Sequence, residues 1–181
     1  MTTPPAVLVL PGYGDSGPEH WQSLWEAADA RLRRVQQADW FEPRLEDWLG
    51  ALDAAITACA EAPVIVAHSL GCVLLAHWVQ RTGGAVRGAL LVAPADVDAI
   101  ALVLDTVQSF APVPLVRLPF PSIVVASDDD TYVTAARARA FARAWGSRFV
   151  GLSGVGHINT DSGLGQWAEG RALLDELLAA R

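Results

Sequence analysis

The segment of residues 63–79 constrains the fold most, because its apolar pattern changes at a single serine. It reads PVIVAHSLGCVLLAHWV. Residues 64–66 are a short β-branched run, which is typical of a strand buried on both faces. Residues 72–79 are apolar on almost every side, as expected for a helix that packs against the middle of a sheet. The segment therefore predicts a buried strand, a sharp turn and a buried helix in immediate succession.

The turn is a G-x-S-x-G pattern with alanine in its first position. It begins at Ala67 and ends at Gly71. Small residues are needed there because the strand turns sharply into the helix and leaves the serine hydroxyl exposed at the tip. Ser69 could instead cap the following helix, as serine often does. We favour a nucleophile, because a candidate acid and a histidine follow in the order Ser, Asp, His.

The rest of the chain alternates between strand and helix patterns. We expect strands at residues 7–10, 35–38, 64–66, 86–93, 122–126 and 149–152, and helices at residues 19–32, 45–59, 72–79, 135–145 and 164–178. Such alternation implies an α/β fold in three layers, α/β/α, with a mainly parallel sheet of about six strands and right-handed crossovers. In the mixed segment 95–121, residues 97–107 could form a helix, but the prolines that follow exclude regular structure. We expect this segment to pass over the site.

Composition limits the partners that the protein could have. With 181 residues, the chain (1–181) is expected to form one domain with one core. A hydrophobic content of 52% and a net charge of −7 argue against nucleic acid as a partner. Without a membrane-length apolar run or a signal sequence, we expect no membrane partner and a cytoplasmic protein. Cys59 and Cys72 lack metal-ligand spacing and are expected to be core residues, and neither a metal nor a cofactor is implied.

A serine hydroxyl needs a base to take its proton, and that base must be oriented by an acid. The chain has four histidines. His20 and His77 lie in predicted helices, and His68 directly precedes Ser69, so that its side chain should point the opposite way. His157 lies in the loop SGVGH after the last strand, from which it can reach back over the sheet. We therefore predict that His157 is the base.

The candidate acids are three consecutive aspartates after the strand at residues 122–126, namely Asp128, Asp129 and Asp130. Such a run often caps the next helix or faces solvent. A metal site is a further alternative, but the spacing matches no calcium loop. Only one of the three needs to orient the base.

A second serine motif lies near the start of the chain. Residues 14–18 read GDSGP, which resembles the serine loop of chymotrypsin-like proteases. Those proteins consist of two β-barrels, and the helix-rich pattern here contradicts that fold. We therefore expect Ser16 to be a turn residue.

Four motifs together resemble a known family. VIVAHSLG, the late GVGH, LPGYGDSGPEHW and SDDDTYV are similar to the small α/β hydrolases of the YdeN-like family, to which the retinoblastoma-binding serine hydrolase also belongs, and the likeness covers essentially the whole chain. In that family the acid belongs to a D-x-x-[VL]-[PST] pattern. Asp130 fits this pattern and Asp129 is out of register by one. The resemblance thus implies that Ser69 is the nucleophile, Asp130 the orienting acid and His157 the base.

The same resemblance implies roles in binding. The backbone amides of Tyr13 and Leu70 correspond to an oxyanion hole, although Pro11 stands where many larger hydrolases have histidine. His20 and Trp21 match a family pattern of undefined role, and from its spacing alone Trp21 is expected in the core. The residues expected to bind substrate are Gly12, Tyr13, His20, Trp21 and His68.

The implied function is a serine hydrolase that cleaves a small ester, thioester or amide through an acyl-enzyme. The partner would be that small molecule, and the sequence identifies no protein partner. The alternative is an inactive hydrolase-fold protein that binds another protein through an outer face. The intact order of Ser69, Asp130 and His157 argues for the enzyme.

Overall fold

The apolar runs form one sheet of six parallel strands in the computed structural model, which describes residues 5–180. The strand order is β2-β1-β3-β4-β5-β6. The four central strands are buried along their whole length, because helices cover both faces of the sheet. The strands are β1 (Val7–Leu10), β2 (Leu32–Arg34), β3 (Val64–His68), β4 (Gly88–Val92), β5 (Ser122–Ser127) and β6 (Arg148–Leu152).

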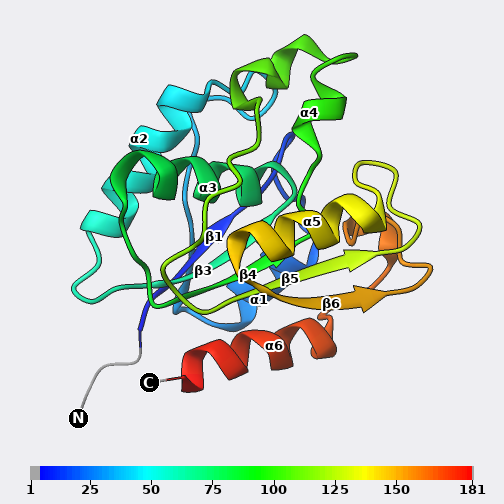
Figure 1. The fold of residues 1–181 in the computed structure, drawn as a ribbon. Coiled ribbons are helices and arrows are strands. Elements are labelled where there is room, and N and C mark those ends of the chain that lie inside the picture. The colour runs from blue at the N-terminus through cyan, green and yellow to red at the C-terminus, as the bar shows by residue number, and fades with distance from the viewer. Residues whose placement is uncertain (1–4, 181) are drawn as a thin grey trace.

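Five longer helices complete the three layers. In Figure 1, α2, α3 and α5 lie on one face of the sheet, and α1 and α6 lie on the other. Each face has its own cluster of buried apolar side chains. The helices are α1 (Trp21–Ala28), α2 (Leu45–Thr57), α3 (Leu70–Thr82), α5 (Ala135–Trp145) and α6 (Ala168–Ala179); shorter are α4 (Val97–Ile100) and the 3₁₀ helices η1 (Asp105–Phe110) and η2 (Thr160–Ser162). The predicted α/β/α fold is confirmed.

Several predicted boundaries were wrong. The second strand lies at Leu32–Arg34 and not at residues 35–38, so Leu32 belongs to this strand and not to the preceding helix. Of residues 35–38, Val35 alone continues the pairing with β1, through its amide, which donates to the carbonyl oxygen of Val9. Helix α1 ends at Ala28, because the chain is already extended at Asp29. The possible helix at 97–107 divides into α4 and η1. The last helix begins at Ala168 rather than at residue 164, after Trp167 with φ 39°.

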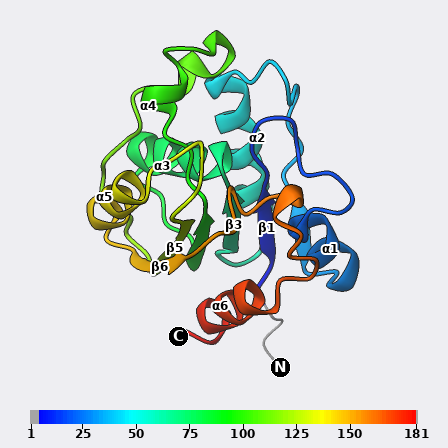
Figure 2. The same cartoon turned by 90° about the vertical axis from the view of Figure 1, so that its right-hand side faces the viewer.

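The parallel strands place the candidate residues at one edge of the sheet. Ser69 directly follows β3, Asp130 comes shortly after β5, and His157 comes after β6. Because the carboxyl ends of parallel strands meet at one edge, these segments converge there. In Figure 2 the segment after β6, drawn in orange, runs back across this edge towards β1 and α1. None of the helices within residues 5–180 combines the length and the apolar character needed to cross a membrane.

Candidate active site

Ser69 occupies a strained turn between β3 and α3. Its φ is 53° and its ψ is −119°, values that are uncommon for a residue with a side chain. The side chain makes no capping hydrogen bond to α3, so the capping alternative is wrong. Instead, Oγ of Ser69 lies 2.9 Å from Nε2 of His157.

The small residues of the turn are required by close contact with the loop after β1. A Cβ atom on Gly71 would lie 2.4 Å from the carbonyl oxygen of Leu10 and 2.8 Å from that of Pro11. A Cβ atom on Gly12 would lie 2.8 Å from Cβ of Ser69. The turn and the loop therefore pack backbone against backbone, which places the amides of the loop beside the serine.

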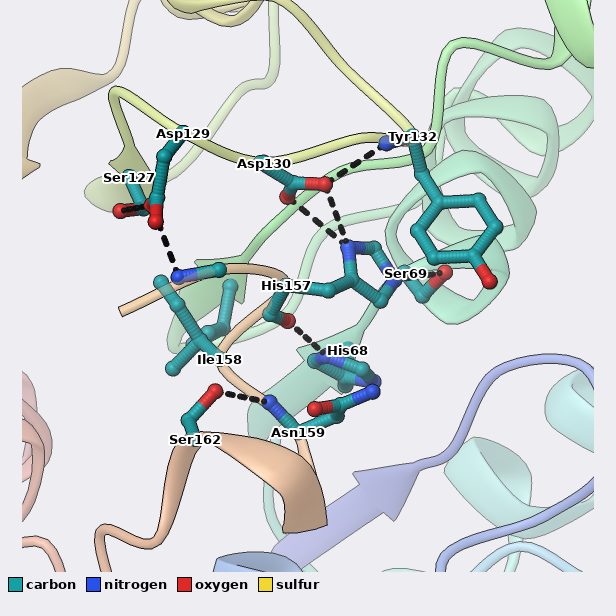
Figure 3. A network of polar contacts seen from close by, with 12 residues as sticks. His68, Ser69, Ser127, Asp129, Asp130, Tyr132, His157, Ile158, Asn159 and Ser162 are labelled. Atoms are coloured by element: carbon teal, nitrogen blue, oxygen red, sulfur yellow. Dashed lines mark hydrogen bonds and ion pairs between the residues drawn. The ribbon is translucent and has the colours of Figure 1, made fainter. Parts of the chain in front are cut away.

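His157 joins Ser69 to Asp130 (Figure 3). Its Nδ1 lies 2.8 and 3.0 Å from the two carboxylate oxygens of Asp130, and the Asp130 side chain is fully buried. A carboxylate accepts, so Nδ1 carries the proton and Nε2 is left to accept from the Ser69 hydroxyl. The amide of Tyr132 also donates to Asp130, at 2.8 Å. The arrangement can move a proton from the serine to the imidazole while the aspartate holds the ring.

Asp128 and Asp129 are exposed, which agrees with one of the two expected alternatives, but they do not cap the next helix, which was the other. Thr134 caps α5 through its side chain. Both carboxylates also accept from the loop that carries His157. The bonds from Ser153 and Gly154 lower the pKa of Asp128, and the bond from Ser127 of β5, followed by that from Gly156, lowers the pKa of Asp129. The bonds run from Ser153 Oγ (2.6 Å) and Gly154 N (3.0 Å) to Asp128, and from Ser127 Oγ (2.6 Å) and Gly156 N (2.8 Å) to Asp129.

His68 contacts the backbone of the same loop. It is buried, and its Nε2 lies 2.9 Å from the carbonyl oxygen of His157. A carbonyl only accepts, so Nε2 of His68 carries the proton. Burial, followed by the neighbouring His157 and His20, lowers the pKa of His68 well below its usual value. The neutral ring therefore supports the loop and does not reach Ser69 as a base.

His20 and Trp21 differ in their relation to the site. His20 is the N-cap of α1: its Nδ1 accepts from the amide of Gln22 at 3.1 Å, and its ring lines the cavity beside Ser69. Trp21 lies in the core and does not line that cavity, which corrects its expected role in binding substrate. Its indole donates to the carbonyl oxygen of Ile158 at 2.8 Å and so ties α1 to the loop after His157.

We expect the free energy of unfolding to fall as the pH falls from about 6.5 towards 4. Burial above all, then the charge of Arg34 and then His157, lowers the pKa of His20 to about 4, and burial also lowers the pKa values of His68 and His77. The unfolded chain binds these protons near pH 6.5 and the folded chain does not. The stabilisation is therefore complete above pH 6.5 and is lost on acidification, by about 3 kcal/mol for His20.

Thermal midpoints measured between about pH 7 and pH 4 test this expectation. The control is His20→Asn, in which the asparagine oxygen can still cap α1 but nothing titrates at that position. Its midpoint should fall less over this range than that of the unaltered protein. The lowered pKa values of Asp128 and Asp129 add a loss of stability that sets in near pH 3.8, where the unfolded chain takes up these protons, and this loss is the same in His20→Asn. A midpoint that stays level down to pH 4 would contradict the expectation.

A cavity of about 240 Å³ opens beside Ser69 and His157. Segment 95–121 covers part of it, as expected from the sequence. The apolar part of its lining, called the apolar wall below, consists of Leu70, Ala95, Val97, Ile100, Leu104 and Val107. The rest of the lining, apart from Ser69 and His157, is mostly polar and consists of Gly12, Tyr13, Asp15, Gly17, His20, His68, Tyr132, Asn159 and Thr160. The cavity is small for a ligand pocket, so a small substrate suits it best.

Two backbone amides of the cavity wall suit a negatively charged oxygen. Leu70 is the first residue of α3, so its N–H has no acceptor within the helix. The N–H of Tyr13 makes no hydrogen bond to backbone within residues 5–180. Both residues line the cavity with Ser69. Paired N–H donors of this kind can hold an oxyanion.

Sequence reasoning missed part of the site. The residues of the apolar wall in segment 95–121 were not singled out, because the mixed pattern of this segment did not show which of its side chains would face the site. Asn159 and Thr160 were also missed, although they closely follow His157. Asp15 was seen only as part of the GDSGP motif. Ser16 is buried within that motif, donates to Gln22 at 2.7 Å and does not itself line the cavity.

Comparison with known proteins points to one family. The sequence profile described as "Serine hydrolase" matches residues 7–176. A protein from Pectobacterium atrosepticum described as a YdeN-like hydrolase has a similar structure with a TM-score of 0.85 and 31% identity, over 96% of this chain and 90% of that one. The ydeN gene product of B. subtilis has a TM-score of 0.78 and 23% identity, over 97% and 100% of the two chains.

More distant structures share the fold. The esterase RhEst1 from a Rhodococcus species has a TM-score of 0.65 and 16% identity, over 96% of this chain and 91% of that one. No curated protein matches the sequence. The profile match spans nearly the whole chain, and the similar structures share its fold. The chain therefore belongs to the serine hydrolase family, as a YdeN-like α/β hydrolase.

Proposed function

We propose that the protein cleaves small esters through an acyl-enzyme formed on Ser69, with His157 as the base and Asp130 as its orienting acid. Thioesters and amides share the same carbonyl chemistry. The observation that supports this most is the continuous chain of hydrogen bonds from Ser69 Oγ to His157 Nε2 at 2.9 Å and from His157 Nδ1 to Asp130 at 2.8 Å. This chain of hydrogen bonds begins at Ser69 in its strained turn, and Ser69 and His157 both line the cavity.

In the first half of the reaction, Oγ of Ser69 attacks the carbonyl carbon of the ester while its proton moves to Nε2 of His157. The carbonyl oxygen becomes an oxyanion, which the amides of Tyr13 and Leu70 can stabilise. The bond to the leaving oxygen then breaks, and Nε2 gives its proton to the departing alcohol. The acyl group remains on Ser69.

In the second half, water takes the place of the alcohol. Nε2 of His157 accepts a proton from the water as its oxygen attacks the acyl carbon. When the bond to Oγ breaks, the proton returns to Ser69 and the carboxylic acid leaves. Asp130 stays ionised throughout and holds Nδ1, which stabilises the imidazolium formed in each half.

We expect a preference for short acyl chains, because the cavity is small and its apolar wall is close to Ser69. In a series of p-nitrophenyl esters from acetate through butyrate and octanoate to palmitate, kcat/KM should be highest at the short end. Leu104→Ala should shift the preference towards longer chains, because Leu104 lines the cavity. Leu102→Ala is the matched control, since Leu102 is 84% exposed and is not part of the wall.

A maximum at palmitate, with activation at a lipid surface, would overturn this substrate class. So would the same chain-length profile in Leu104→Ala as in the unaltered protein. The absence of turnover for every ester, thioester and amide tested would overturn the proposed function and favour the alternative of an inactive binding protein.

A further inference from the structure

The loop of residues 153–158 carries His157 but has no regular secondary structure. Its path is unusual, because Gly154, Gly156 and Ile158 all have positive φ. The backbone groups of such a loop need partners from elsewhere. Side chains from distant parts of the chain supply most of them, and they do so from two sides.

On one side, side chains at the end of β5 accept from the amides of the loop. The amides of residues 154, 155 and 156 donate in turn to Asp128 (3.0 Å), to Ser127 Oγ (3.1 Å) and to Asp129 (2.8 Å). The Ser127 hydroxyl itself donates to Asp129 at 2.6 Å. Two of these three acceptors are carboxylates, and hydrogen bonds to an ionised carboxylate are stronger than neutral ones.

On the other side, three side chains donate to the carbonyl oxygens of the loop. Ser162 Oγ donates to the carbonyl of Val155 at 2.5 Å, His68 Nε2 to that of His157 at 2.9 Å, and Trp21 Nε1 to that of Ile158 at 2.8 Å. Figure 3 shows Asp129 and His68 on different sides of this loop, with His157 between them.

Two of these hydrogen bonds lie on either side of the Cα atom of His157 along the backbone. One joins Asp129 to the amide of Gly156, the residue before it, and the other joins His68 to the carbonyl of His157 itself. We propose that Asp129 and His68 are positioning residues, which fix the backbone at His157 so that its ring meets Ser69 and Asp130 at once. This inference rests on the proposed function of these three residues.

The ring has little freedom to compensate for a shifted backbone. Nε2 must stay near 2.9 Å from Ser69 while Nδ1 stays near 2.8 Å from Asp130. The side chain of Asp130 is fully buried, and Ser69 is fixed by the strained turn between β3 and α3. A displacement of about 1 Å in a reacting group can cost about 10² in rate. Loss of either bond should therefore lower kcat and leave KM almost unchanged.

Asp129 is tested with a graded pair of variants. Asp129→Asn keeps one oxygen that can accept from the Gly156 amide, whereas Asp129→Ala removes the acceptor. We expect kcat for a short p-nitrophenyl ester to fall in the order unaltered protein, Asp129→Asn, Asp129→Ala, with a total loss of up to about 10². Asp128→Ala is the matched control, because Asp128 holds the loop farther from His157, and it should lose less.

His68 is tested with a pair of similar size. His68→Gln can place an amide N–H where Nε2 stood and donate to the His157 carbonyl, whereas His68→Leu cannot donate. His68→Gln should therefore retain more kcat than His68→Leu. Thermal midpoints are measured for all variants, so that a loss of folded protein is separated from a loss of rate in the folded fraction.

The possible outcomes distinguish the positioning role of Asp129 and His68 from the proposed function of Ser69. Unchanged kcat in both Asp129→Ala and His68→Leu, with Ser69→Ala inactive, would overturn the positioning role and leave the proposed function standing. A change in KM rather than kcat would also overturn it, as would equal losses in the two members of each pair. If Ser69→Ala keeps full turnover, the proposed function fails and this inference fails with it.

Discussion

Ser69→Ala should lower the turnover of a short ester by several orders of magnitude, on the order of 10⁶ as in another serine hydrolase. The variant should fold normally, because the Ser69 side chain does not cap α3 and its Oγ bonds to His157. Turnover of p-nitrophenyl acetate and the thermal midpoint, measured on the same preparation, test both parts.

The matched control is Ser16→Ala, which alters the serine of the GDSGP motif. Ser16 donates to Gln22 in the interior, so its loss should cost about 1 kcal/mol of stability and little activity. If Ser16→Ala were inactive and Ser69→Ala retained turnover, the nucleophile would lie in the first loop and the site would have to be redrawn.

Asp130→Asn is expected to lower turnover by roughly 10⁴, judging from the equivalent change in a protease. An asparagine amide can donate to Nδ1, and it then favours the tautomer in which Nε2 carries the proton and cannot accept from Ser69. The variant should keep the shape of the site. Steady-state kinetics with a short ester measure the loss.

Asp175→Asn serves as the control for Asp130→Asn, because Asp175 lies on α6 with its side chain exposed. It should leave turnover unchanged. Asp129→Asn, measured beside these variants, separates the orientation of the His157 ring from the support of its loop. Asp129→Asn should lose less turnover than Asp130→Asn. Near-normal turnover in Asp130→Asn together with an inactive Asp129→Asn would show that the register taken from the family is off by one.

The turn at Ser69 could be predicted from sequence because the pattern that marks it is local. The apolar runs on each side of the serine indicate the strand and the helix, although the contact that requires Gly71 is with Leu10 and Pro11 of the distant loop after β1. The fold class followed from the alternation of such runs. The choice among the three aspartates did not follow from any local pattern, and it rested on the resemblance to the family.

What sequence reasoning missed depends on contacts between distant segments. Asp128 and Asp129 looked like capping residues because their partners lie more than twenty residues later in the chain. Trp21 looked like either a core or a site residue, since only the folded chain brings its indole to Ile158. The position of β2 was missed because Leu32 fits both a helical stripe and a strand, and pairing with β1 decides between them.

Labelling of the native protein with a fluorophosphonate, followed by mapping of the modified peptide by mass spectrometry, tests the activation of Ser69 most directly. A reagent of this kind reacts with a serine whose proton a neighbouring base can take. We predict one label, on Ser69. It should not form when the protein is denatured before the reagent is added or in Ser69→Ala, and it should form much more slowly in Asp130→Asn. A native protein that takes up no label, or that carries it on Ser16 or another serine, would contradict the account.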